Sequence, residues 1–240
     1  MISLVRSTPT ILKNLLFLFI LVACSPTYKQ PTVIHHAMPN LKVSTDWVET
    51  AGCHLNATSP ERYSGSCTSE SPLLKMGCER IEVSYLFGGL SFPVVTCANS
   101  DLELLGTDYA QVGCMFQQTE AFLTLKDGNY QFVGTDEIKA MSVPIDSPDE
   151  ALSYALVTTD YYAAYDFIIN SYREFLVDKI EDTFVEEVPN GYIVHLFSNQ
   201  EPQCGCGTHY TNSVAVLVYK NGNIKKINSH HVYKYDACVD

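Results

Sequence analysis

The fold depends on the stretch Ser147-Pro148-Asp149-Glu150-Ala151-Leu152. Ser147 is a typical N-cap residue, Pro148 suits the first helical position, and Glu150 stands where a capping box places its carboxylate. Behind them, Ala151, Leu152, Ala155 and Leu156 recur at the spacing of one helix face. The stretch therefore predicts a helix that begins at Pro148, in the second half of a 240-residue chain.

Two further sets of apolar residues follow this helix start. The first set is aromatic, as is typical of a packed core, and consists of Tyr161, Tyr162, Tyr165 and Phe167. A second set either prolongs the helix or forms another one, and consists of Ile168, Tyr172, Phe175, Leu176 and Ile180.

The last 60 or so residues predict two β-hairpins. Strand-forming residues 183–188 and 192–197 flank Pro189-Asn190-Gly191, and residues 214–219 and 224–227 flank Asn221-Gly222. Both faces of residues 214–219 are apolar, which indicates a central strand with one face packed on the helix.

The N-terminal half is also rich in predicted strands. Residues 81–87 and 90–97 are separated by Gly88-Gly89, and Asp127-Gly128 is a strong hairpin signal. Residues 47–78 are rich in Ser, Gly, Pro and Thr, so we expect them to need their cysteines for rigidity. The whole pattern predicts an α+β protein: a β-rich, disulfide-containing N-terminal half, then a helix followed by an antiparallel sheet of two hairpins.

The first residues have the composition of an export signal. Residues 1–14 contain Arg6 and Lys13 and no acidic residue, and residues 15–22 are all apolar. This apolar run is shorter than the roughly 20 residues that a membrane-spanning helix needs.

The stretch Leu21-Val22-Ala23-Cys24 resembles the lipobox of bacterial lipoproteins. That resemblance covers residues 1–25 and implies lipidation of Cys24, with palmitate-type acyl chains, at the new N-terminus of a membrane-anchored protein. In such proteins Ser25, rather than Asp, implies sorting to the outer membrane where the host has one. The alternative is an ordinary signal peptide with a chance cysteine.

These features divide the chain into four parts: a signal peptide (1–23), a tether (24–46), a β-rich cysteine-containing region (47–143), and a helix-plus-sheet region (144–240). We expect His35 and His36, in the tether, to be solvated rather than to bind a ligand. The order of helix and antiparallel strands is also loosely similar to cystatin-like modules of exported bacterial proteins, a resemblance of fold that implies no function.

Assigning Cys24 to lipid leaves an even set of cysteines, which predicts disulfides in an exported protein. The disulfide candidates are Cys53, Cys67, Cys78, Cys97, Cys114, Cys204, Cys206 and Cys238. Odd numbers of them lie before residue 120 and after residue 200. Complete pairing therefore requires at least one bridge between the two regions, and the other outcomes are a free thiol in each region or a metal site.

The densest motif is Cys204-Gly205-Cys206-Gly207-Thr208-His209. Thiolates and imidazoles bind zinc, so Cys204, Cys206, His209 and Cys238 form an alternative metal site. A reactive thiol paired with His209 or His195 is a third interpretation. Disulfides suit an oxidising compartment better. We expect His195, on a predicted strand, to be a hydrogen-bonded or surface residue.

Charge and motifs restrict the function further. The net charge is −12, and removing the leader lowers it by two, so nucleic acid is a poor partner. The sequence contains no phosphate-binding Gly-rich loop, metalloprotease helix motif or serine-nucleophile elbow, and no cofactor is implied. A hydrolase built on acidic pairs such as Glu186-Glu187 is disfavoured, because neighbouring strand residues face opposite sides. We therefore expect a non-enzymatic binding or interaction module at the cell envelope, and the alternative is a metal-binding or thiol-active protein.

Overall fold

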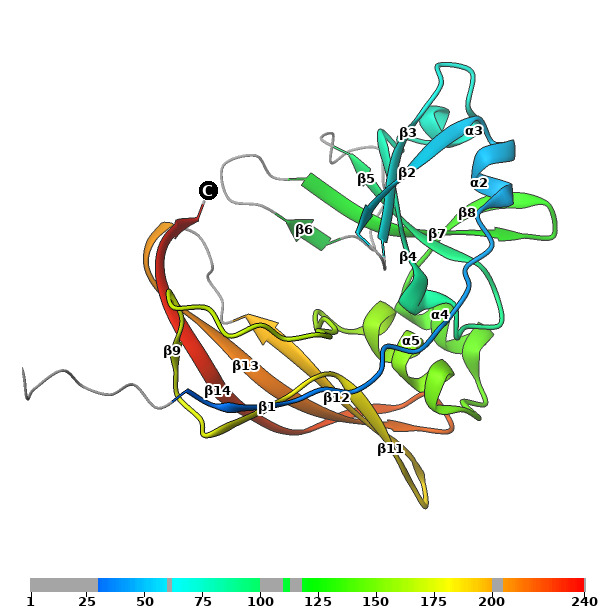
Figure 1. The fold of residues 1–240 in the computed structure, drawn as a ribbon. Coiled ribbons are helices and arrows are strands. Elements are labelled where there is room, and N and C mark those ends of the chain that lie inside the picture. Colours follow the sequence, from blue (N-terminus) through cyan, green and yellow to red (C-terminus); the bar gives the residue numbers. More distant parts are fainter. Residues whose placement is uncertain (1–29, 60–61, 100–109, 113–117, 200–204, 240) are drawn as a thin grey trace, which may run out of the picture. The chain divides into compact units, whose positions relative to one another are not determined.

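The computed structural model of the chain confirms the α+β class, with few helices and two large antiparallel sheets (Figure 1). It describes residues 30–59, 62–99, 110–112, 118–199 and 205–239.

The N-terminal half forms an antiparallel sheet in the order β2-β3-β4-β5-β7-β6, with β8 paired to β7. Its strands are β2 (Cys53–Ser59), β3 (Arg62–Cys67), β4 (Arg80–Ser84), β5 (Val94–Asn99), β6 (Ala110–Val112), β7 (Gln118–Lys126) and β8 (Asn129–Val133). The expected hairpin is confirmed, because Asp127 and Gly128 both have positive φ, 50° and 77°. Two positive φ values match the twist of the flanking strands.

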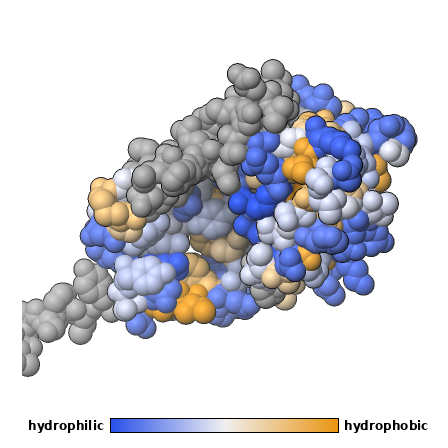
Figure 2. All heavy atoms as spheres, turned by 90° about the horizontal axis from the view of Figure 1, so that it is seen from above, coloured by the Kyte–Doolittle hydropathy of each residue, from blue (hydrophilic) through white to orange (hydrophobic). Residues whose placement is uncertain are grey.

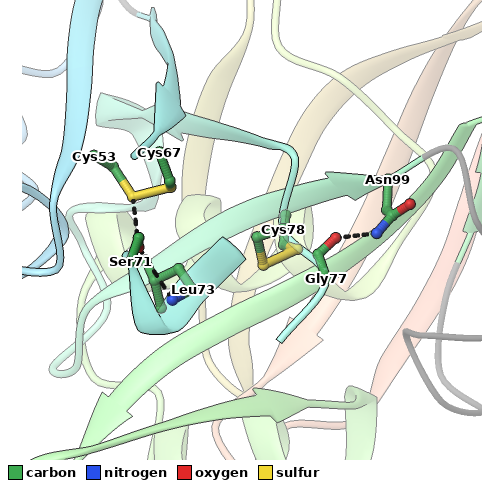
Figure 3. The surroundings of a disulfide bond; sticks show 8 residues. Cys53, Cys67, Ser71, Leu73, Gly77, Cys78 and Asn99 are labelled. Carbon is green, nitrogen blue, oxygen red and sulfur yellow. Dashed lines mark hydrogen bonds between the residues drawn. A yellow bond between two sulfur atoms is a disulfide. The ribbon is translucent and has the colours of Figure 1, made fainter. Parts of the chain in front are cut away.

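Disulfides and two short helices complete this half. Cys53 is bonded to Cys67, its direct partner in the β2–β3 pair, and Cys78 is bonded to Cys97 (Figure 3). The helices α2 (Asp46–Thr50) and α3 (Pro72–Lys75) add Trp47, Val48 and Leu73 to the core around them. The chain-entropy model gives each bridge about 3 kcal/mol, which supports strands that the composition of residues 47–78 did not predict.

The helix predicted from Ser147 is confirmed as α5 (Pro148–Thr158), which follows α4 (Thr135–Ser142). The Ser147 Oγ accepts a hydrogen bond from the Glu150 amide at 3.1 Å. The Glu150 carboxylate reaches back to the Asp146 amide at 2.8 Å. The first bond satisfies an amide that the first helical turn leaves unpaired, and the second fixes the residue that precedes the N-cap.

The apolar residues from Ile168 to Ile180 form no helix, contrary to the sequence prediction. The chain leaves α5 after Thr158 and then runs along the second sheet, where Tyr162 and Phe197 exchange backbone hydrogen bonds of 2.9 Å. This segment forms the short strands β9 (Glu174–Phe175) and β10 (Lys179–Glu181). Its backbone groups find partners in the sheet, so tertiary pairing overrides the local helical spacing.

The second sheet contains both predicted C-terminal hairpins, in the order β11-β12-β13-β14-β9. The longer strands are β11 (Phe184–Val188), β12 (Gly191–Asn199), β13 (Gly205–Tyr219) and β14 (Ile224–Val239). As predicted, residues 214–219 lie in a central strand, β13, and Val214, Val216 and Val218 are buried in the core that contains α5.

An irregularity in β14 shapes the opposite face of this sheet. Thr211 is opposite Tyr233 and Asn212 is opposite His231, so Val232 is an extra residue in β14. Such a bulge places two residues against one on the partner strand. Val232 and Tyr233 consequently enter the same small core with Ile180 and Phe197.

Part of the segment that we expected to be a tether pairs with the body. β1 (Thr32–Ile34) pairs in parallel with β10, and the Thr32 amide donates to the Asp178 carbonyl at 2.9 Å. Figure 1 shows β1 (blue) running beside the second sheet. Residues 32–34 of the expected tether are therefore paired with the body.

Ser153 connects the helix to the N-terminal half. Its fully buried hydroxyl donates to the Leu86 carbonyl at 2.6 Å and accepts from the Gly89 amide at 2.9 Å. Leu86 lies in the 3₁₀ turn η1 (Tyr85–Phe87). A Cβ on Gly89 would lie 2.1 Å from the Asp149 carbonyl oxygen, so only glycine permits this close approach.

We predict that Ser153→Ala lowers the free energy of unfolding by about 2–4 kcal/mol, because two buried backbone groups lose their partner. Urea unfolding followed by circular dichroism measures this change. The control is Ser229→Ala on the exposed part of β14, which should change stability by less than about 0.5 kcal/mol. Equal effects of the two substitutions would contradict the connecting role of Ser153.

Candidate functional site

A pocket of about 280 Å³ lies between β10 and the face of the second sheet that is turned away from α5. The strands β10 to β14 all contribute to it. Its lining residues are Lys179, Ile180, Glu181, Asp182, Phe184, Glu186, His195, Leu196, Phe197, Ser213, His230 and Val232. Phe184 is opposite His195 and Phe197 is opposite Ser213, so these four side chains share one face of the sheet.

Three stacked rings form one wall of this site. The Phe184 ring lies 4.0 Å from the His195 ring, centroid to centroid, with an interplanar angle of 4°. On its other face the His36 ring lies 4.4 Å away at 16°. His36 is thus packed against the body rather than solvated, contrary to expectation. The stack joins the segment that follows β1 to β11 and β12.

Carboxylates lie at the edges of the two imidazoles. Glu186 Oε1 is 3.3 Å from His195 Nε2, and Glu181 Oε2 is 3.9 Å from His36 Nε2. Lys179 forms an ion pair with Glu181. The fixed charges of the pocket lining are three carboxylates and one ammonium group, so the pocket has a negative potential over an aromatic surface.

Burial lowers the pKa of His195 below its ordinary value, because desolvation disfavours the charged imidazolium. The charges of Glu186 and Glu181 act in the opposite direction, and His36 adds to the lowering. The net direction of this pKa shift favours a neutral His195 ring near pH 7, stacked on Phe184. His195 therefore faces a pocket, which its place on an alternating strand did not reveal.

The buried Asp182 carboxylate joins two backbone segments beside the pocket, at His36 and at Asp166–Phe167. It accepts hydrogen bonds from the amides of His36, Asp166 and Phe167 at 3.0–3.3 Å, and from His35 Nδ1 at 3.0 Å. The His35 side chain is 54% exposed, so it stays solvated, as expected, while it makes this one hydrogen bond. We call this arrangement the Asp182 clasp.

Ligand atoms of His35, Asp166 and Asp182 lie within 4.8 Å of one another, a spacing that a metal ion can bridge. However, Asp182 Oδ2 already accepts from three donors. A carboxylate only accepts, so His35 Nδ1 carries the proton in their bond and offers no lone pair there. The cluster is therefore explained by hydrogen bonding.

The alternative metal site loses two of its four ligands in the structure. Cys206 and Cys238 are direct partners in the β13–β14 pair and are joined by a disulfide. The His209 Nε2 lies 3.2 Å from the Ala237 carbonyl, and its ring stacks on Tyr235. The motif is thus a bridged strand pair, and the same bridge removes the Cys206 thiol from any reactive pair.

All three described disulfides lie within the N-terminal or the C-terminal cysteine group. Cys24, Cys114 and Cys204 lie outside the described residues. The bridge between the two regions therefore stays a prediction. Because the three described disulfides use six of the eight candidate cysteines, this bridge would have to join Cys114 to Cys204.

The pocket also contains a serine, a histidine and a glutamate. Among the described residues, no hydrogen bond joins Ser213 to His195, and His195 Nε2 faces Glu186 instead. Nucleophilic catalysis needs the base within hydrogen-bond reach of the hydroxyl.

The acidic pair Glu186-Glu187 is divided between the two faces of the sheet, as the strand pattern predicted. Glu186 faces the pocket, whereas Glu187 is opposite Tyr192, whose ring is buried on the helix side.

No protein-family model matches this chain, and neither curated proteins nor solved structures give a match. Over the described residues, no helix is both long and apolar enough to span a bilayer.

We predict that His195→Gln reduces the loss of stability at acid pH. Because the folded pKa of His195 is lowered, the unfolded chain binds more protons below the ordinary histidine pKa. The free energy of unfolding of the parent protein should therefore fall between pH 7.5 and pH 5.5 by more than that of the variant. Urea unfolding at both pH values measures the difference.

The non-titrating substitution Asn228→Gln, opposite Ala215 on the same sheet, serves as the control and should retain the parental pH dependence. Identical pH dependence of the parent and His195→Gln would show that burial of this imidazole does not make the free energy of unfolding depend on pH.

Proposed function

We propose that this protein is a lipid-anchored bacterial envelope protein that acts as a non-enzymatic binding module. The Leu21-Val22-Ala23-Cys24 stretch supports the anchor, and the disulfides at Cys53–Cys67, Cys78–Cys97 and Cys206–Cys238 are consistent with an oxidising compartment. Outer-membrane sorting, from Ser25, is part of the same proposal.

The pocket beneath β10 is the observation that carries the binding function. It combines apolar and aromatic side chains, among them Phe184, Phe197 and Val232, with an excess of carboxylates. The carboxylates attract a cation, and the apolar side chains favour an apolar group. The ligand class that fits both features is a small organic cation with an apolar body, such as an arylalkyl ammonium ion.

Two observations favour binding over the metal or thiol alternative. The Cys206–Cys238 bridge uses two of the sulfur atoms that the alternative requires. The pocket lining contains no cysteine, and the His195 imidazole is directed at Glu186 rather than at a hydroxyl.

The anchor is tested by Cys24→Ser in the native host. We expect the parent protein to fractionate with membranes and its N-terminal peptide to carry the mass of a thioether-linked diacylglycerol. The variant should lose both properties, because without acyl chains the body has no stable anchor. An unmodified Cys24 in the mature parent protein would refute the lipoprotein proposal.

The ligand class is tested with benzylammonium and benzoate, which share a ring and differ in charge. We expect benzylammonium to shift the amide resonances of residues 195 and 213 saturably and benzoate to leave them unchanged. Glu186→Gln should weaken benzylammonium binding by about tenfold, the effect of about 1.4 kcal/mol.

The matched control is Glu187→Gln, which removes the same charge from the neighbouring residue on the opposite face of β11. Equal loss of affinity in both variants would show that the ligand responds to overall charge rather than to this pocket. Preference for benzoate would overturn the assigned ligand class.

A further inference from the structure

Residues 166–178 form a loop that contains the short strand β9 and is fastened beside β1; we call it the anchor-side loop. At one end the amides of Asp166 and Phe167 donate to the Asp182 carboxylate. At the other end the Asp178 carbonyl accepts from the Thr32 amide at 2.9 Å. Both ends of the loop are therefore attached to elements that pack on β1.

This loop exposes large apolar side chains. Ile168, Tyr172 and Leu176 are 70%, 63% and 42% exposed, and they are three of the seven exposed large hydrophobic residues among the described side chains. On the face shown in Figure 2, apolar surface (orange) forms separate patches amid hydrophilic surface. A concentration of apolar side chains within nine residues marks a contact surface.

Contacts of Arg173 and Leu176 with the second sheet hold this loop in place. The Arg173 guanidinium carbon lies 4.6 Å from the centre of the Tyr233 ring and 5.3 Å from those of Phe167 and Tyr172. The Leu176 amide donates to the Val232 carbonyl at 2.9 Å. Among the described residues, no carboxylate lies within ion-pair distance of Arg173, so its charge remains available to an anionic group beside the apolar row.

The length of chain before the body limits how far this loop lies from the anchor. Six peptide steps separate Cys24 from Gln30, where the described structure begins. An extended chain of that length spans at most about 20–22 Å. If Cys24 carries lipid, the bilayer therefore lies within about that distance of Gln30, and Gln30 is two residues before Thr32, which contacts Asp178.

We propose that the anchor-side loop rests on the bilayer that holds the lipid anchor, with Ile168, Tyr172 and Leu176 at the lipid surface. This inference rests on the proposed lipid anchoring. Aromatic and aliphatic side chains next to a cation are the composition that favours the membrane interface. The contact orients the body, so that the pocket under β10 is presented close to the membrane.

The test places the body, residues 25–240, on vesicles through an N-terminal hexahistidine tag and a nickel-chelating lipid in phosphatidylcholine. The variant Tyr172→Trp reports contact through quenching by brominated acyl chains, after subtraction of the signal of the parent, which contains Trp47. The matched control is Ile227→Trp, an exposed apolar position on β14 that is 50% exposed.

We expect bromolipid to reduce the Tyr172→Trp emission and to leave the Ile227→Trp emission unchanged. Ile168→Ser with Leu176→Ser should abolish the quenching at position 172. Equal quenching at both positions, or none at 172, would overturn the proposal, as would concentration-dependent cross-linking between copies through residue 172. Because the tag replaces the lipid, this result is independent of whether Cys24 is acylated in cells.

Discussion

The buried Asp182 carboxylate is the interaction on which the functional half of this molecule depends. It accepts hydrogen bonds from three backbone amides and from the His35 imidazole. These donors lie in the segment after β1 and at the start of the anchor-side loop. Hydrogen bonds to an ionised group are worth about 1.5–3 kcal/mol each. Loss of the carboxylate would release the segment that brings His36 onto Phe184 and the loop that carries Tyr172.

The second sheet uses its two faces for different purposes. Val194, Leu196, Val214 and Val216 pack with α5 in a dry core, whereas Phe184 and His195 line the pocket on the other face. The period of two along each strand makes this separation possible. It also explains why Glu186 reaches the pocket and Glu187 does not, a separation that was inferred from the strand pattern alone.

Disulfides stabilise the places where composition is least favourable for regular structure. The Cys53–Cys67 bridge closes the β2–β3 hairpin, whose residues include Gly65 and several serines. The Cys206–Cys238 bridge fixes the ends of β13 and β14, beyond the apolar part of the hairpin. Both bridges join directly opposed residues, so they fix strand register as well as limiting the unfolded chain.

The sequence by itself determined the features that depend on neighbouring residues: the α5 cap at Ser147, the turn at Asp127-Gly128, both C-terminal hairpins, and the α+β class. Only the tertiary structure decided the course of residues 159–182, whose apolar spacing favours a helix but whose backbone pairs with the sheet. It likewise decided the stack of His36, Phe184 and His195, because residues about 150 positions apart meet only through the β1–β10 pair and the Asp182 clasp. Neighbouring residues determine backbone dihedral preferences and which side chains share one face of a helix or strand. Such a site also requires hydrogen bonds between residues far apart in the chain, and these cannot be inferred from a local pattern.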